Sequence, residues 1–195
     1  MERRLERERR AGEAHRTYDL SPETLGRMAD RCELRWDHPA IRSDKPSTFD
    51  DQSLEDVGLD AGEREAAQKV LEAFNARALA EVRRLYTEVT GDENTENLAP
   101  EAMMAEINDK TDKREVRQVF ERLAAERAGR TPPPGDIPAN TPFDQLYRLL
   151  LGAGDSLEAE LADVVGAKKA RGLRDAHDGW GSKSRSSYGC PERTP

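Results

Sequence analysis

The amino-acid sequence predicts an all-α protein, with one long amphipathic helix, five or six shorter helices folded against it, and irregular N- and C-terminal segments packed together. Charged residues make up 36% of the 195 residues and aromatic residues only 5%. Such a polar chain buries the narrow apolar stripes of helices more easily than the broad face of a sheet. Helix start and stop signals also recur along the chain, and one stretch of about 28 residues follows a helical apolar period throughout.

Composition divides the chain into three segments. Residues 1–16 are rich in charge and are a candidate for disorder. Residues 17–177 hold all the helical patterns and are predicted to form a single helical domain, since this length is ordinary for one domain. Residues 178–195 form a Gly/Ser-rich tail, which we expect Cys190 to hold back against the helical domain.

The first helix is predicted to begin at Ser21, a residue type that caps helix N-termini well. Pro22 suits the first helical position, and Glu23 favours the positive end of the helix dipole. The helix is short, because its apolar stripe ends before residue 32.

An extended segment follows this helix. Cys32, Leu34 and Trp36 alternate with charged residues, which places one apolar face inward, and Pro39 ends the segment. Residues 42–53 have no apolar period and are predicted to be loop.

The strongest element lies between Asp60 and Gly91. Asp60 and Glu63 have the spacing of a capping box, and Gly91 is placed for a left-handed helix end. About 28 residues of helix span roughly 42 Å. The apolar stripe consists of Val70, Leu71, Phe74, Ala78, Val82, Leu85, Tyr86 and Val89.

The remaining helices are predicted from similar signals. One begins near Pro100, and another begins at Asp112 and ends at Gly129. A proline-rich connector over 131–142 follows, and helix restarts from Thr141. We interpret the glycines of 151–155 as a junction between two helices, and expect a further break near Gly166.

The two flanks of the helical region carry matching residues. Both cysteines, both tryptophans and two of the three histidines lie there: Cys32, Trp36, His38, His177, Trp180 and Cys190. We favour a Cys32–Cys190 disulfide, which contributes about 5 kcal/mol in the chain-entropy model and is typical of an oxidising compartment. A Cys2His2 metal site formed by Cys32, His38, His177 and Cys190 is an alternative with unusual ligand spacing, and two unrelated free thiols are a second.

Charge is distributed unevenly along the chain. The net charge of −8 argues against a general nucleic-acid-binding protein, because phosphate neutralisation needs a basic surface. Residues 88–112 are strongly acidic, whereas the segment from Lys168 to Arg185 is basic. These are either solvated faces that attract each other, or an acidic patch for a cationic ligand or partner. The expected partner is a protein or an unfolded client.

No catalytic residue and no cofactor are predicted. The chain lacks the G-x-S-x-G, Walker and G-x-G-x-x-G motifs and the spacings of common metal ligands. Met103 and Met104 are consecutive, so on a helix they diverge by about 100°, and we expect one in the core and the other at a groove or interface. The candidate binding residues are Trp36, His38, His177, Trp180, Met103 and Met104.

The compartment is predicted from the cysteines. No apolar stretch reaches the ~20 residues of a transmembrane helix, and the charged N-terminus lacks the apolar region of a signal peptide. The disulfide nevertheless favours the periplasm or cell envelope, with a membrane anchor missing from this chain; the alternative is a cytoplasmic protein.

Residues 57–89, VGLDAGEREAAQKVLEAFNARALAEVRRLYTEV, resemble the small helical periplasmic proteins with LTxxQ motifs, which include envelope-stress chaperones and heavy-metal sensors. The shared features are the Val-Gly-Leu lead-in, the capped helix start and the Arg/Glu-rich amphipathic helix. The Thr and Gln of the motif are absent from residues 59–63, LDAGE. The resemblance implies an envelope protein that binds partners and catalyses no reaction.

The resulting expectation is a non-enzymatic extracytoplasmic helical binding protein, acting as a stress-related chaperone, sensor or adaptor. One alternative is an enzyme with its site where the His38 and His177 flanks meet. The other is a cytosolic protein-interaction module with reduced thiols.

Overall fold

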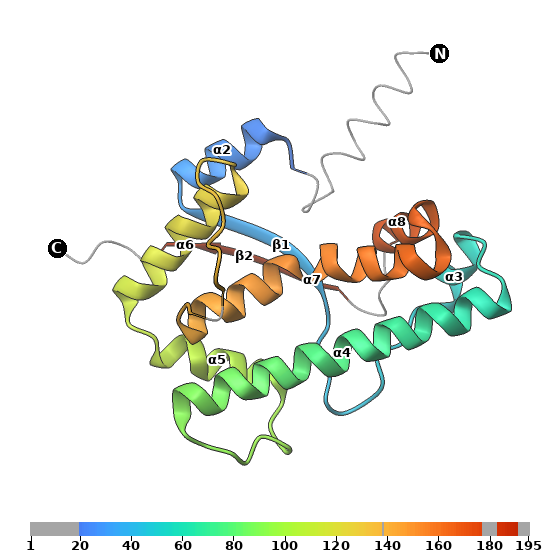
Figure 1. The fold of residues 1–195 in the computed structure, drawn as a ribbon, viewed down its shortest axis with the longest axis horizontal. Coiled ribbons are helices and arrows are strands. Elements are labelled where there is room, and N and C mark those ends of the chain that lie inside the picture. The colour runs from blue at the N-terminus through green and yellow to red at the C-terminus, as the bar shows by residue number, and fades with distance from the viewer. Residues whose placement is uncertain (1–19, 138, 177–182, 191–195) are drawn as a thin grey trace.

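A computed structural model describes residues 20–137, 139–176 and 183–190 (Figure 1). The described part is mostly helical, with one long helix and six shorter ones, so the predicted fold class is confirmed. The elements in chain order are α2 (Pro22–Asp30), β1 (Glu33–Pro39), α3 (Asp51–Asp56), α4 (Ala61–Thr90), α5 (Pro100–Lys110), α6 (Lys113–Arg127), α7 (Pro142–Val165), α8 (Ala167–Asp175) and β2 (Lys183–Gly189).

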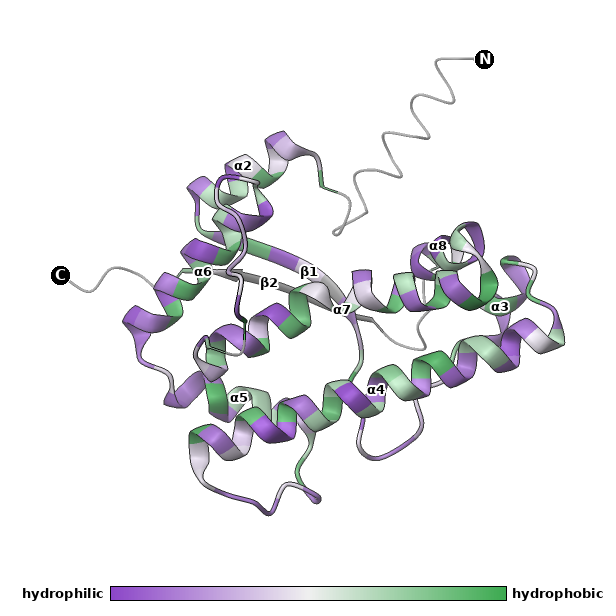
Figure 2. Ribbon diagram, in the orientation of Figure 1, coloured by the Kyte–Doolittle hydropathy of each residue, from purple (hydrophilic) through white to green (hydrophobic). Residues whose placement is uncertain are grey.

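The centre of the fold is an antiparallel pair of helices, α4 and α7, which lie side by side in Figure 1. The α4 helix has 30 residues and begins with the predicted capping box between Asp60 and Glu63. It ends at Gly91, whose φ of 74° is the left-handed conformation expected there. Apolar and polar residues alternate along both helices in Figure 2, and the buried apolar positions of α4 meet those of α7.

The α7 helix corrects one prediction. Residues 151–155 continue as regular helix and form no junction, so the chain is a single helix of 24 residues from Pro142 to Val165. Ala153 and Gly154 are buried in this stretch, and burial of the surrounding apolar face outweighs the low helix propensity of glycine. The predicted break at Gly166 is confirmed, because its φ of 83° separates α7 from α8.

Two short helices close one end of the α4–α7 pair. The α3 helix begins at Asp51, within the range predicted to be loop, because the Asp50 side chain caps it by accepting from the Ser53 backbone N–H at 2.9 Å. A Cβ at Gly172 of α8 would lie 3.0 Å from Cγ2 of Val57. Glycine therefore permits the close approach of α8 to the chain that follows α3.

The terminal segments are packed together, as predicted, and are more regular than predicted. They form a two-stranded antiparallel ribbon in which Glu33 of β1 pairs with Gly189 of β2 and Pro39 with Lys183. The backbone of Cys32 has a φ of 53°, which turns the chain from α2 into β1. One face of β1 packs against α7 (Figure 1).

A buried ion cluster joins α6 to α7. Asp144 is completely buried and accepts from Arg122 at 2.7 Å and from Arg148 at 2.8 Å. Arg148 also binds both carboxylate oxygens of Glu126, at 2.7 and 2.9 Å. These hydrogen bonds, first of all those to Glu126, raise the pKa of Arg148 above its ordinary value. The cluster fixes the position of α6, which in turn contacts β1.

Candidate functional site

A pocket of about 320 Å³ opens between the end of β1, one side of α5 and the middle of α7. Its size is at the lower end of the range of small-molecule sites. Three walls supply its lining: Trp36, His38, Ala40 and Ile41 from β1 and the residues after it, Glu101, Met104, Ala105, Asn108 and Asp109 from α5, and Leu146, Tyr147 and Leu150 from α7.

The first wall results from the alternation of side chains along β1. Leu34, Trp36 and His38 lie on the face that packs inward, and each of these side chains is at most 6% exposed. The ring of Trp36 meets that of Tyr147 edge to face, with centroids 5.7 Å apart. Nδ1 of His38 lies 2.8 Å from the carbonyl oxygen of Pro39, which can only accept, so Nδ1 carries a proton.

The second wall is α5, whose two methionines point in different directions. Met103 is fully buried in the core, whereas Met104 is partly exposed and lines the pocket. Glu101 and Asp109 are exposed at the pocket and lie toward opposite ends of the helix.

A polar contact holds α5 against α4. The Tyr86 hydroxyl donates to Oε2 of Glu106 at 3.0 Å. Burial, together with this hydrogen bond, raises the pKa of Tyr86 above its ordinary value of 10.0. The hydroxyl therefore keeps its proton, and the contact, at neutral pH.

The third wall is part of an aromatic cluster. Tyr147 packs against Phe143, with ring centroids 4.6 Å apart, and against Phe120 of α6 at 4.8 Å. Because Trp36 contacts the same tyrosine, the cluster joins β1, α6 and α7 behind the pocket. Two rings of this cluster, Trp36 and Tyr147, therefore line the pocket.

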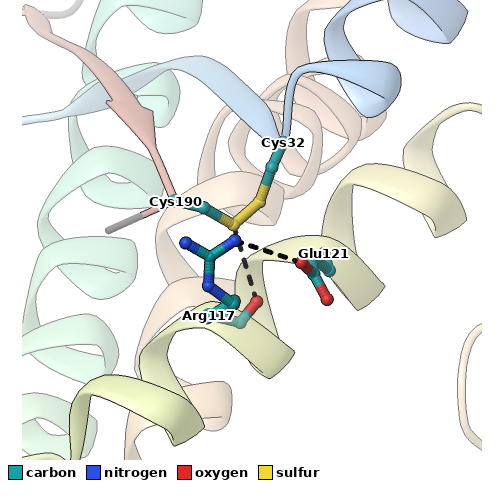
Figure 3. The surroundings of a disulfide bond; sticks show 4 residues. All are labelled: Cys32, Arg117, Glu121 and Cys190. Atoms are coloured by element: carbon teal, nitrogen blue, oxygen red, sulfur yellow. Dashed lines mark hydrogen bonds and ion pairs between the residues drawn. A yellow bond between two sulfur atoms is a disulfide. The ribbon is translucent and has the colours of Figure 1, made fainter. Parts of the chain in front are cut away.

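The disulfide lies at the other end of the ribbon. Cys32 and Cys190 are bonded, with Cα atoms 5.5 Å apart, and the Cys190 backbone N–H donates to the Cys32 carbonyl at 3.1 Å. Arg117 and Glu121 of α6 lie beside the bond (Figure 3), and Sγ of Cys190 is 3.7 Å from the Arg117 carbonyl oxygen. The disulfide holds β2 on β1 and thereby supports the strand that forms the first wall.

The alternative of a Cys2His2 metal site does not fit this structure, because both sulfurs are used by the disulfide and neither is a thiolate. The same bond removes the alternative of two free thiols. Cys32, Cys190 and Glu121 have potential ligand atoms within 4.8 Å of one another, but only the carboxylate among them is a donor of ordinary strength.

The acidic and basic segments do not pair with each other among the described residues. Lys169 binds Glu63 at 2.6 Å, and Arg174 binds Asp155 and Glu158 at 2.7 and 2.6 Å. Lys169 and Arg174 of α8 are therefore paired with acids of α4 and α7, and the ion pairs of Glu88 and Glu106 in the acidic segment are formed with Arg84 and Lys110 instead.

The structure places four of the six candidate binding residues. Trp36, His38 and Met104 come together in the pocket, and Met103 belongs to the core. His177 and Trp180 lie outside the described residues. The sequence did not indicate the wall formed by α7, or that Glu101 and Asp109 of α5 line the pocket. Leu146, Tyr147 and Leu150 have an ordinary helical core pattern, which does not distinguish a cavity wall from a packed core.

Searches against protein-family profiles, curated proteins and solved structures gave no match. Among the helices of the described residues, none is both long and apolar enough to cross a membrane.

Proposed function

We propose that this chain is a non-enzymatic extracytoplasmic binding protein, a sensor or adaptor, that takes a small molecule into the pocket between β1, α5 and α7. The observation that supports this most is the composition of the pocket. Aromatic and aliphatic side chains form its walls and a few polar groups lie at its edge, which is the usual make-up of a small-molecule site.

The extracytoplasmic part of the proposal depends on the disulfide. A bond between Cys32 and Cys190 closes a loop across 158 positions of sequence and holds the ribbon in place. Disulfides that support structure in this way persist mainly in oxidising compartments such as the periplasm and the extracellular space.

A sensor or adaptor fits the surface better than a chaperone for unfolded clients. Within the described ranges, the large apolar side chains that are exposed are Ile137 and Val164, each at 43%. A chaperone that captures unfolded chains needs a contiguous apolar patch. The proposal also includes a protein partner that distinguishes the ligand-bound pocket from the empty one.

The binding proposal is tested with N-phenyl-naphthylamine, a neutral apolar dye whose fluorescence rises in apolar sites. Ala105→Phe places a ring in the pocket from an exposed position of α5, whereas Ala102→Phe adds the same ring at an exposed position of α5 outside the lining. We expect saturable dye binding to the wild type and to Ala102→Phe, and at least tenfold weaker binding to Ala105→Phe. Equal binding to all three proteins would contradict the proposal.

The compartment is tested by counting thiols in denatured, non-reduced protein freshly isolated from its own cells. We expect no free thiol, because both cysteines are bonded. Two free thiols would overturn the extracytoplasmic part while leaving the pocket in place.

A further inference from the structure

We propose that the pocket binds a linear organic dication, an aliphatic chain with an ammonium group at each end. The inference rests on the proposed function, since it names the class of molecule that the same pocket takes. It is argued from the charge at the edge of the pocket, the spacing of that charge and the surface between.

The charged side chains that line the pocket are both carboxylates, Glu101 and Asp109. Neither forms an ion pair with another described residue, whereas Glu106 on the same helix has a partner in Lys110 at 3.6 Å and Glu88 has one in Arg84 at 2.8 Å. The described lining contains no lysine or arginine that would compete for a cationic ligand. The edge of the pocket is therefore complementary to positive charge.

The spacing of the two carboxylates excludes a single small cation. Glu101 and Asp109 are eight positions apart on α5, which is about 12 Å along the helix axis at ~1.5 Å per residue. A metal ion needs its oxygen ligands within about 2.6 Å. No cluster of metal-ligating side chains was found at the pocket among the described residues. Two separate positive groups, held roughly 1 nm apart, fit this spacing instead.

The surface between the carboxylates is suited to methylene groups. Met104 and Ala105 lie between Glu101 and Asp109 on α5, opposite Trp36 and Tyr147. Burial of an aliphatic chain against such side chains is favourable because it removes apolar surface from water.

The wider charge distribution favours cations at this end of the molecule. The net charge is −8, and the loop that leads into α5 adds Asp92, Glu93 and Glu96. The basic helix α8 lies at the opposite end of the α4–α7 pair (Figure 1). A field of this kind raises the local concentration of cations and their association rate at low ionic strength.

The test compares molecules that share one carbon chain and differ in end groups: α,ω-diaminooctane, octylamine, α,ω-octanediol and octanedioate. Binding is followed by Trp36 fluorescence in a Trp180→Phe protein, so that one tryptophan reports, and by competition with N-phenyl-naphthylamine. We expect the diamine to bind about tenfold more tightly than the diol, octylamine to fall between them, and octanedioate to bind most weakly. The preference should decrease as salt screens the exposed carboxylates.

Variants that replace each carboxylate by an amide test whether the ammonium groups bind at Glu101 and Asp109. Glu101→Gln and Asp109→Asn should each weaken diamine binding about threefold, a typical value for one exposed ion pair, and leave the diol unchanged. Glu55→Gln is the matched control, since it removes one exposed charge from α3, at the other end of the α4–α7 pair and outside the pocket lining. It should leave the preference for the diamine within experimental error.

The outcomes separate the two proposals. If the diol or octanedioate binds as tightly as the diamine and Ala105→Phe blocks it, the dication inference is wrong and the pocket-binding function stands. If the dye binds in the pocket but no eight-carbon molecule competes with it, the inference is likewise wrong. If neither the dye nor any of these molecules binds, both proposals fail.

Discussion

The α4–α7 helix pair is held together by repeated apolar contacts along its length, whereas the β1–β2 ribbon is held by one disulfide, by its backbone pairing and by contacts of β1 with α7, α6 and α2. A two-stranded ribbon alone is marginally stable in water. The helix pair therefore supplies a large part of the apolar core, while the ribbon depends on the disulfide and on its contacts with the helices. Because β1 forms one wall of the pocket, the part of the molecule that we assign to binding is also the part most sensitive to redox state.

The largest expected effect comes from removing the disulfide. The Cys32→Ser/Cys190→Ser double variant should lose about 5 kcal/mol of unfolding free energy, because the loop closed by the bond is long. The loss should fall on the ribbon first, so in a Trp180→Phe background the Trp36 fluorescence should shift to longer wavelength while far-UV circular dichroism keeps its helical signal. Urea denaturation followed by both signals measures this. Coincident transitions at the wild-type midpoint would show that the bond does not stabilise the ribbon.

The second-largest loss of unfolding free energy is expected when a core residue of the α4–α7 pair is truncated. Leu157 of α7 is fully buried in the core, so Leu157→Ala should cost about 3 kcal/mol through lost burial and the cavity that remains. Here fluorescence and circular dichroism should change together, in contrast to the disulfide variant. Val164→Ala, at an exposed position of the same helix, is the control and should change stability by less than about 0.5 kcal/mol. An equal loss in both variants would contradict the assignment of Leu157 to the core.

A smaller loss of unfolding free energy is expected when the ion cluster between α6 and α7 is altered. Asp144→Asn keeps the shape of the side chain but removes the buried carboxylate that accepts from Arg122 and Arg148, at an expected cost of about 2 kcal/mol. Glu121→Gln breaks only an exposed pair with Arg117 and should cost less than about 1 kcal/mol. Chemical denaturation of both variants checks this order, and a larger loss in Glu121→Gln would reverse it.

The smallest expected effect is a pH dependence of the unfolding free energy, contributed by Glu63 at the start of α4. The hydrogen bond from Lys169, followed by that from the Asp60 backbone N–H, lowers the pKa of Glu63 below its ordinary value of 4.5. The carboxylate therefore stabilises the folded state above pH 4.5, and this contribution is lost as the pH falls through the lowered pKa. Glu63→Gln retains an acceptor for the capping box but has no charge.

The wild type should thus be more stable than Glu63→Gln at neutral pH, and the difference should disappear in acid. Thermal denaturation of both proteins, at a series of pH values from neutral down to below the lowered pKa of Glu63, measures this difference in stability. A difference that grows as the pH falls would contradict the assignment.

The elements that local signals define were predictable from sequence. The capping box of Asp60 and Glu63, the left-handed Gly91 and the alternation from Cys32 to Trp36 each depend on residues close together in the chain. The pairing of the two cysteines was predictable because both lie in flanks that carry the same residue types.

Features that depend on distant contacts were not predictable. The glycines of 151–155 remain helical because α7 is buried against its neighbours, and no local signal reports this. Residues 183–189 were predicted to be an irregular tail. They form a strand by pairing with β1, which is distant in sequence, so no local signal indicates it. The pocket likewise depends on how three elements converge, so sequence indicated Trp36, His38 and Met104 but not the opposite wall.

The central claim is that the disulfide-supported ribbon forms one wall of a pocket that binds a small molecule. It is tested most directly by measuring the affinity of N-phenyl-naphthylamine for Trp180→Phe protein in the oxidised form and in the form reduced with a phosphine. We predict at least tenfold weaker binding after reduction, with the helical circular dichroism signal retained. Equal affinity in the two forms, with the thiols shown to be free, would contradict it.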